Sequence, residues 1–464
     1  MNKNQILRNI TVEKFASQGK ALSKIDGFVI FIENSVPGDI VDARVKKVKK
    51  NFAEAVALRI VHPSPLRVEP KCRHFGVCGG CKWQNLDYNS QLQFKQQEVV
   101  EAFEHIAGIQ PEEVLPILPS PDIFYYRNKL EFTFSVHPWF QTMPQGNQQR
   151  QGQALGFHAP KSFFKVVDIE QCLLQPEPSN QIRNFVRTIA KDKGLEFYNI
   201  KQHKGFLRTL TLRNNSSGQF MVILQVAENS QEKIASVLEP LIKQFDAIVS
   251  AYYIVNQKKN DSYADLEPQL FYGQPYLIEQ LNGLKFKIRP KSFFQTNVKQ
   301  AVNLYNVAKK FADLDGTQVV YDLYSGTGTI SLYVADKAKK VVGIEYIDQA
   351  VADAKENAQL NAITNAEFIA ADINTVFTPE FISLHGKPQV LIIDPPRAGM
   401  SKKVIQTIKF IRPQKIVYIS CNPSTQARDV QMLSDLYVLK KIQPVDMFPH
   451  TYHIENVALL EQKA

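Results

Sequence analysis

The chain has 464 residues, which is too long for one hydrophobic core, so two to four domains are expected. No stretch approaches the roughly 20 apolar residues of a membrane-spanning helix, and the first residues lack the apolar core of a signal peptide, so we expect a cytoplasmic protein with no membrane partner. The 55 Lys and Arg exceed the 45 Asp and Glu, giving a formal charge of +10 that suits a polyanionic partner without requiring one. Nothing indicates an obligate protein partner.

Residues 1–62 are predicted to form a small β-barrel. Short β-prone segments separated by turn residues occur at 10–12, 27–32, 40–45 and 53–58. A barrel of the OB type closes many short strands without exposed edges and often binds nucleic acids. The range carries 11 Lys and Arg against 6 Asp and Glu, concentrated in the run Lys46-Lys47-Val48-Lys49-Lys50. A lysine run taken alone is more often a solvated charged hairpin.

Residues 63–284 are predicted to form a central domain of mixed α/β structure. Apolar residues at helical spacing predict a helix over 89–107, ended by Gly108. Strands and a further helix near 180–193 are expected between residues 125 and 280.

Four of the five cysteines lie in this central range: Cys72, Cys78, Cys81 and Cys172. An odd number of cysteines without an export signal argues against a disulfide framework and favours metal binding or catalysis. The first three lie in a glycine-rich segment too short to fold without a staple. Four thiolates can close a tetrahedral site, for which zinc is the chemically simpler occupant, although the spacing departs from paired C-x-x-C ribbons.

From residue 285 to residue 464 the sequence predicts an α/β domain with a Rossmann-like, doubly wound parallel sheet. Strand-forming and helix-forming segments alternate, with strands expected at 318–323, 340–345, 366–370, 390–394 and 416–421. A last strand over 455–460, inserted antiparallel, would make this the methyltransferase variant of the fold. Ligand sites are expected beyond the carboxyl ends of the strands.

A glycine turn, Tyr324-Ser325-Gly326-Thr327-Gly328-Thr329, follows the first of these strands and predicts a nucleoside cofactor site. Glu345 ends the next strand, where a carboxylate can accept both ribose hydroxyls. An NAD site would prefer a third glycine, but Ser331 occupies that position. Asp322, before the turn, suits the sulfonium of S-adenosylmethionine better than a pyrophosphate.

Two strand ends supply candidate catalytic groups. Asp394 begins an Asp-Pro-Pro motif, but Arg397 follows where enzymes that methylate exocyclic amines have an aromatic residue. Cys421 ends the fifth strand, where a thiolate could add to carbon 6 of a uracil and make carbon 5 nucleophilic. Glu455 could then remove the carbon 5 proton. Taken singly, such a cysteine is usually a small buried hydrophobe, and such a carboxylate a solvated charge.

Four motifs together resemble the bacterial RNA uracil-5-methyltransferase family over nearly the whole chain. They are FFQTN at 293–297, DPPRAG at 394–399, SCNP at 420–423 and MFPHTYHIEN at 447–456. The resemblance implies that Cys421 is the nucleophile and Glu455 the base. It also implies that S-adenosylmethionine contacts four residues: Gln295, Tyr324, Glu345 and Asp394.

The N-terminal barrel resembles the TRAM domain of the ribosomal RNA members of this family. The resemblance implies that the four central cysteines hold a 4Fe-4S cluster rather than zinc. It implies an RNA partner, 23S rRNA rather than tRNA, because the tRNA members are expected to be shorter and to lack the barrel and the cysteines. The alternatives are an RNA amino-group methyltransferase that uses Asp394-Pro395-Pro396, or methylation of uridine 54 in tRNA.

Two other classes are disfavoured. A non-catalytic binding protein would not need both Cys421 and Glu455. A radical S-adenosylmethionine enzyme would need a C-x3-C-x2-C motif, which the triad of Cys72, Cys78 and Cys81 does not match.

Overall fold

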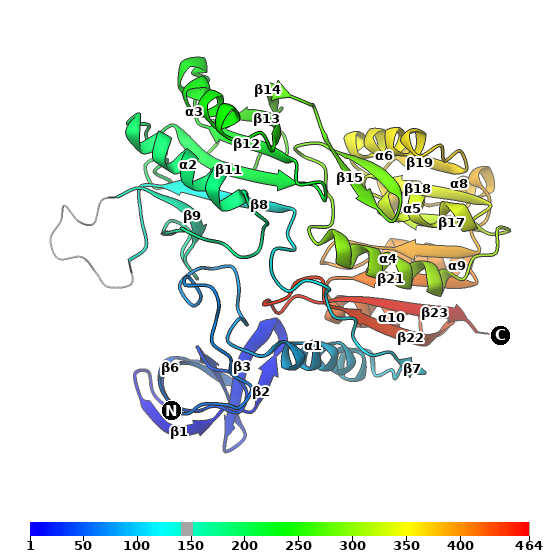
Figure 1. The fold of residues 1–464 in the computed structure, drawn as a ribbon. Helices are drawn as coiled ribbons and strands as arrows, with labels where there is room; N and C mark the ends of the chain where they lie inside the picture. Colours follow the sequence, from blue (N-terminus) through cyan, green and yellow to red (C-terminus); the bar gives the residue numbers. More distant parts are fainter. Residues whose placement is uncertain (141–151, 464) are drawn as a thin grey trace.

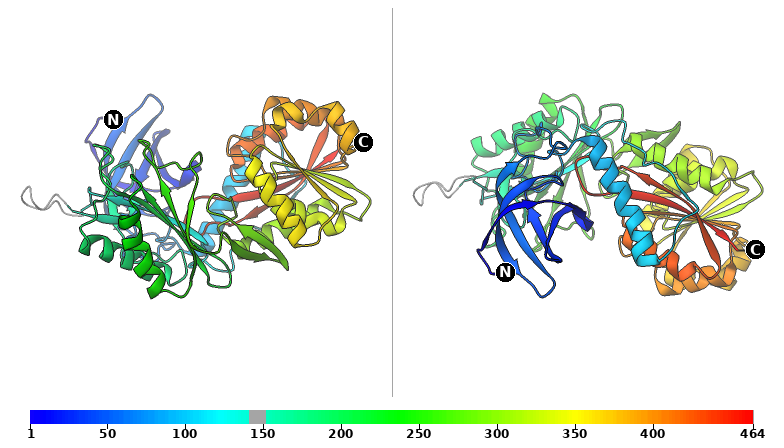
Figure 2. Two further views of the ribbon diagram at one scale, coloured as in Figure 1. Left: turned by 90° about the horizontal axis from the view of Figure 1, so that it is seen from above. Right: turned by 90° about the horizontal axis from the view of Figure 1, so that it is seen from below.

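Three β-sheet units follow one another along the chain in the computed structural model, which describes residues 1–140 and 152–463 (Figure 1). The N-terminal and central units lie beside each other, and the C-terminal unit lies at the opposite end of the molecule, with the C-terminus at its outer edge (Figure 2). None of the described helices is both long enough and apolar enough to cross a membrane. The arrangement confirms the predicted α/β class with an OB-type N-terminal unit.

The N-terminal unit is a curled sheet of six strands in the order β1-β5-β6-β4-β3-β2. The strands are β1 (Ile6–Thr11), β2 (Lys14–Ala16), β3 (Lys20–Ile25), β4 (Phe28–Glu33), β5 (Ile40–Val48) and β6 (Phe52–His62). β2 and β3 are additional to the predicted strands. Three register shifts between β5 and β6 bend this pair, because each bulge sharpens the local twist. Small side chains such as Ala43, Ala53 and Ala55 fill the tight interior.

The central unit is a seven-stranded sheet in the order β10-β9-β8-β11-β12-β13-β14. Its strands are β8 (Lys129–Ser135), β9 (Ala154–His158), β10 (Val166–Asp168), β11 (Leu207–Asn214), β12 (Phe220–Val226), β13 (Ile248–Val255) and β14 (Gln269–Gly273). Its helices are α2 (Ser179–Asp192) and α3 (Gln231–Gln244). Both helices pack their apolar sides into one core with the sheet, and α2 fulfils the predicted helix near 180–193.

The C-terminal unit is an eight-stranded sheet in the order β19-β18-β17-β20-β21-β23-β22-β7. Its strands are β17 (Val319–Leu323), β18 (Lys340–Glu345), β19 (Ala366–Ala370), β20 (Val390–Ile393), β21 (Lys415–Ser420), β22 (Tyr437–Val445), β23 (Glu455–Gln462) and β7 (Glu113–Val114). β23 runs antiparallel between β21 and β22, as predicted for the last strand. The short strand β7, from within the range 63–284, pairs with β22 at the sheet edge.

Helices cover both faces of this sheet. One face packs against α4 (Val298–Ala312), α5 (Thr329–Val334) and α6 (Asp348–Leu360). The other packs against α8 (Pro379–His385), α9 (Lys402–Ile411) and α10 (Pro423–Leu433). Two smaller pieces complete the unit, the helix α7 (Ile373–Val376) and the hairpin β15 (Leu277–Leu281) and β16 (Leu284–Ile288). Because both faces are buried, the strands read as continuous apolar runs.

Helix α1 (Tyr88–Ala102) joins the N-terminal part of the chain to the C-terminal sheet and packs against α10 and β22 (Figure 1). It continues as one π-helical turn and ends at Gly108 in the left-handed conformation, close to the predicted bounds. Its buried side carries three polar residues, Ser90, Gln91 and Lys95. The Lys95 Nζ atom lies 2.6 Å from Asp446 Oδ1, and both side chains are 0% exposed. This buried ion pair fastens α1 to the loop between β22 and β23.

Candidate active site

The turn after β17 has the backbone conformation of a ligand-binding loop. Gly326 and Gly328 have φ values of 53° and 81°, and the non-glycine residue Tyr324 has a φ of 83°. The backbone N–H groups of Tyr324 and Ser325 both donate to the carbonyl oxygen of Ile344, each at 3.0 Å. These bonds fix the turn between the ends of β17 and β18, and they hold Tyr324 in its strained conformation.

Two carboxylates flank this turn. Glu345 accepts from the N–H of Gly326 and from the N–H of Ile347, both at 3.0 Å. Asp322 is fully buried and accepts from Ser331 Oγ at 2.6 Å, while its other oxygen has no partner among the described residues. Burial raises the pKa of Asp322 to about 6. A cationic ligand in this turn would therefore stabilise the charged form of Asp322.

Asp394 and Gln295, the other two residues expected to contact the cofactor, lie in different segments of the chain. Burial, together with the charge of Asp322, raises the pKa of Asp394 above its usual range. Gln295 is buried, and its carbonyl oxygen accepts from Asn128 Nδ2 at 3.1 Å, so the central unit holds this segment in place. Burial raises the pKa of Tyr305 of α4, and the negative charges of Asp394 and Asp322 raise it further.

Cys421 lies between the end of β21 and the start of α10. The Asn422 side chain caps α10 by accepting from the N–H of Ser424, and its Nδ2 donates to the Arg397 carbonyl at 3.0 Å. The Asp-Pro-Pro-Arg loop is thereby tied to the helix that follows Cys421. Burial raises the pKa of Cys421 to about 11, the charge of Glu455 raises it too, and Arg397 opposes both. The helix N-terminus also favours a thiolate.

Glu455 is the first residue of β23. Ser420 pairs with Asn456 in the antiparallel register, so continuing the register by one residue sets Cys421 opposite Glu455. Glu455 is 5% exposed. Burial and the charge of Asp394 raise its pKa well above the usual range, whereas Arg397 lowers it. The structure thus brings a thiol, two carboxyl groups and one guanidinium together at the carboxyl edge of the sheet.

The residue that orients Arg397 is His453. Arg397 Nη2 donates to His453 Nδ1 at 2.9 Å. Burial, with the charge of Arg397, lowers the pKa of His453 to about 4, so the imidazole is neutral and can accept this bond. The loop that carries His453 is itself held from outside the C-terminal unit, because the His450 carbonyl accepts from the N–H groups of Lys82 and Trp83 at 2.8 and 3.0 Å.

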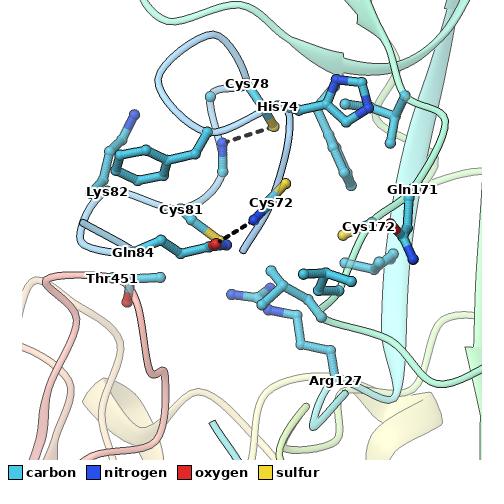
Figure 3. Close-up of a pocket in the computed structure, with 18 of the residues that line it drawn as sticks. Cys72, His74, Cys78, Cys81, Lys82, Gln84, Arg127, Gln171, Cys172 and Thr451 are labelled. Atoms are coloured by element: carbon cyan, nitrogen blue, oxygen red, sulfur yellow. Dashed lines mark hydrogen bonds between the residues drawn. The ribbon is translucent and has the colours of Figure 1, made fainter. Parts of the chain in front are cut away.

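The four central cysteines line one cavity of about 210 Å³. Figure 3 shows Cys72, Cys78 and Cys81 of one loop facing Cys172 across it. Burial raises the pKa of Cys78 to about 11 and that of Cys172 to about 12. Within residues 1–140 and 152–463, no three His, Cys, Asp or Glu side chains lie close enough together to hold a single metal ion.

Three features of the cavity suit an anionic metal–thiolate cluster. Among the described residues, none that lines the cavity carries a carboxylate. Arg127 faces the cavity, and its buried Nε has no hydrogen-bond partner among the described residues. The Gly80 N–H donates to Cys78 Sγ at 3.4 Å, as backbone amides do around cluster thiolates. The donor set therefore fits a group larger than one ion, although the structure does not show a metal site.

Sequence reasoning missed two contacts that shape the site. The Lys95–Asp446 pair joins residues 351 positions apart, and the Arg397–His453 pair joins residues 56 apart. One signal was present for the first pair: Gln91, Lys95 and Val99 follow one another at helical spacing, which places a lysine on the buried side of α1.

Family profiles match two parts of the chain. The tRNA (Uracil-5-)-methyltransferase profile matches residues 268–463, and the TRAM domain profile matches residues 7–58. Full-length relatives include an uncharacterized RNA methyltransferase of Bacteroides thetaiotaomicron, 48% identical over 96% of this chain and 99% of its own. Another, from Porphyromonas gingivalis, is 44% identical over 97% and 98% of the two chains.

A solved structure is also similar over the full length. It is the Pyrococcus abyssi tRNA (uracil-54, C5)-methyltransferase in complex with S-adenosyl-L-homocysteine, with a TM-score of 0.77, 31% identity, and coverage of 98% of this chain and 100% of that one. Fold, site and relatives define an S-adenosylmethionine-dependent RNA methyltransferase. The chain belongs to the uracil-5-methyltransferase family, as its motifs indicated.

One premise of the sequence analysis is wrong. The Pyrococcus abyssi protein is named for tRNA, yet it matches this chain over its whole length, including the region of the N-terminal barrel. Chain length and an N-terminal extension therefore do not separate tRNA enzymes from ribosomal RNA enzymes in this family.

The pKa of Cys421 gives the first prediction. Because the pKa of this thiol is about 11 in the RNA-free protein, its alkylation by iodoacetamide should accelerate about tenfold per pH unit through the neutral and mildly alkaline range. Arg397→Gln should slow the reaction at every pH below 11, since it removes the charge that favours the thiolate. Peptide mass spectrometry measures Cys421 separately from the other cysteines. Arg412→Gln, an exposed arginine, is the control, and equal rates in both variants would contradict the role of Arg397.

Proposed function

We propose that this protein transfers a methyl group to carbon 5 of a uridine in RNA through a covalent adduct with Cys421. The observation that carries the proposal is the register of β21 and β23, which sets Cys421 opposite Glu455 beside Arg397 and Asp394. S-adenosylmethionine, when bound, supplies the methyl group from its sulfonium. Gln295, Tyr324, Glu345 and Asp394 are the residues proposed to hold it.

The residues of the chain act in sequence on the uracil ring. The Cys421 thiolate forms a bond to carbon 6, and the electron pair of the C5–C6 double bond moves toward the carbonyl at carbon 4. Arg397 supplies positive charge near the developing oxyanion. After carbon 5 has gained the methyl group, the Glu455 carboxylate removes the proton of carbon 5. The C5–C6 double bond then re-forms, and the Cys421 sulfur leaves.

Electrostatics supports this assignment of Glu455. Burial and neighbouring carboxylates raise the pKa values of Asp394 and Glu455, which favours their protonated forms. A bound cation beside Asp394 lowers the pKa values of both carboxyls. The base therefore becomes competent when the site is loaded.

The covalent mechanism is tested with RNA that contains 5-fluorouridine, because fluorine cannot leave as a proton does. The wild-type protein should form a stable protein–RNA adduct on denaturing gels, and Cys421→Ala should form none while still binding the cofactor. Glu455→Gln should accumulate an adduct with ordinary RNA, since addition precedes proton removal. Glu461→Gln, on the same strand, is the control. Active Cys421→Ala, or an N-methylated product by nucleoside mass spectrometry, would favour the amino-group alternative.

For the substrate we propose a uridine of 23S rRNA, bound with the help of residues 1–62 and 63–284 while residues 285–464 carry out the chemistry. The TRAM domain match and the charge of +10 support an extended RNA-binding surface. Methylation of uridine 54 in tRNA is the second candidate, and the Pyrococcus abyssi similarity favours it. Either target uridine must leave its stack before Cys421 can reach it.

Labelled cofactor distinguishes the two targets. Incubation with protein-free 23S rRNA and, separately, with unmodified tRNA should label the 23S rRNA preferentially. Deleting residues 1–62 should weaken ribosomal RNA binding and reduce its salt dependence, because the deletion removes phosphate contacts, but it should spare cofactor affinity. Preferential labelling of tRNA would overturn the ribosomal assignment and leave the uridine chemistry standing.

We further propose that Cys72, Cys78, Cys81 and Cys172 hold a 4Fe-4S cluster with a structural role. Three observations support the proposal: four thiols line one cavity, Arg127 faces it, and none of the described lining residues carries a carboxylate. A cluster bound here would stiffen the loop whose Lys82 and Trp83 amides hold His450. Methyl transfer to carbon requires no electron transfer, so no redox role follows. Zinc is the alternative.

The cluster proposal predicts a brown protein when purification excludes oxygen, with about four irons per chain and a broad absorbance that air removes. Cys72→Ser should lower the yield of folded protein more than Cys421→Ala does, because the cluster stabilises a segment with little core of its own. Iron and zinc are measured by elemental analysis. Stoichiometric zinc with negligible iron would reverse the assignment.

A further inference from the structure

One aromatic residue of the central unit, Phe163, projects from the protein surface. Phe163 is 71% exposed in the turn between β9 and β10. Its neighbour Phe164 packs edge-on against His137, with ring centroids 5.6 Å apart, and anchors the turn. Phe163 contacts Phe164 edge-on and projects outward. A single exposed aromatic ring is common on protein surfaces, so Phe163 points to a binding role only together with the charged groups around it.

Phe163 lies in one of three loops that together form an open hollow of about 710 Å³. We call this surface the Phe163 patch, and its lining residues are Phe163, Ile200, Lys201, His203, Lys259, Asn260 and Asp261. Lys201 and Lys259 are exposed, and the Lys201 Nζ lies 3.6 Å from the centre of the Phe164 ring. The patch therefore combines a ring face with positive charges.

Residues 256–261 form one of these three loops, and a buried arginine holds that loop rigid. The buried guanidinium of Arg208 donates to the carbonyl oxygens of Asn256, Lys258 and Asn260 at 2.6–2.8 Å. It also donates to Asp261 at 2.8 and 3.1 Å, so the carboxylate that lines the hollow is neutralised. The loop is pre-ordered, and the hollow keeps its positive character.

The patch is continuous with the basic edge of the N-terminal barrel. Lys161, two residues before Phe163, forms an ion pair with Glu33 of β4. Glu33 also pairs with Lys46, the first residue of the lysine run, at 3.1 Å. Lysines of two units thus lie side by side around one carboxylate. A track of alternating charge and aromatic surface is typical of sites for single-stranded nucleic acid.

We propose that the Phe163 patch binds a single-stranded segment of the RNA substrate outside the active site, with one base stacked on Phe163 and phosphates near Lys201 and Lys259. The proposal rests on the proposed function only in that the partner is RNA. Bases of any identity stack on an aromatic face, so the patch adds affinity without reading sequence. Its place between the barrel and the central sheet suits a strand that continues beyond the target loop.

The test uses a fluorescein-labelled, single-stranded oligouridylate of about 20 nucleotides, with binding measured by fluorescence anisotropy on the full-length protein. Phe163→Ala should raise Kd about tenfold, the usual loss for one stacked base. Phe163→Trp should keep the wild-type affinity, because tryptophan also presents an aromatic face. The control is Phe410→Ala, because Phe410 is 68% exposed on α9, in the C-terminal unit. That variant should bind as the wild type does. Lys259→Ala should reduce the slope of log K against log salt by about 0.7.

Equal Kd values for wild type, Phe163→Ala and Phe410→Ala would overturn the proposal and leave the patch to a protein partner. A Kd for Phe163→Trp as high as that of Phe163→Ala would overturn the proposed stacking contact. Both readouts are independent of methyl transfer, because oligouridylate binding needs neither the cofactor nor Cys421. Evidence for a non-covalent mechanism, or for methylation of an amino group, would therefore contradict the proposed chemistry without affecting this result.

Discussion

The buried ion pair between Lys95 and Asp446 is the constraint on which the geometry of the site depends. Removing two charges from water costs several kcal/mol for each ion, so such a pair persists only when its other hydrogen-bonding groups are satisfied. Here Asp446 also accepts from Tyr88 at 2.8 Å, and Lys95 donates to the Phe448 carbonyl at 3.1 Å. The pair therefore holds α1 against the 446–455 segment. Loss of either partner would leave an uncompensated charge, at a cost of about 3–5 kcal/mol, next to the strand that begins with Glu455.

A second constraint is the charge of three carboxyl groups at the carboxyl edge of the C-terminal sheet. Asp322 and Glu455 are buried and Asp394 is half-buried, and the loss of contact with water raises the pKa of each. Arg397 is the cation that opposes this effect at Cys421 and Glu455, and His453 fixes its direction. The site is thus arranged for a positively charged ligand. A sulfonium bound beside these carboxyl groups would lower their pKa values and favour their charged forms.

How much of this could be predicted from the sequence depends on the range of the interaction. Continuous apolar runs predicted the parallel strands, and the glycine turn, Asp394 and Cys421 could be predicted to lie at strand ends, because these signals lie within a few residues. The Lys95–Asp446 pair and the parallel pairing of β7 with β22 depend on long-range packing, which no local pattern encodes. The grouping of Cys172 with the three other cysteines could be expected, but only because the chain has few cysteines and not from a local pattern. The argument from chain length does not select the substrate, because a structure named for tRNA methylation matches this chain over its whole length.

The position of the 447–455 loop explains why the family fold extends beyond the methyltransferase sheet. On one side, Thr451, Tyr452 and His453 line the cysteine cavity. On the other, the loop leads directly into Glu455, and His453 orients Arg397. A methyltransferase sheet alone would leave this loop exposed and free to move. The proposed reaction would need a thiolate, a cation and a base around one ring, and misplacement of such groups by about 1 Å costs orders of magnitude in rate. The helix α1, the cysteine loop and Tyr126, which donates to the Pro449 carbonyl at 3.0 Å, supply that rigidity from outside the sheet.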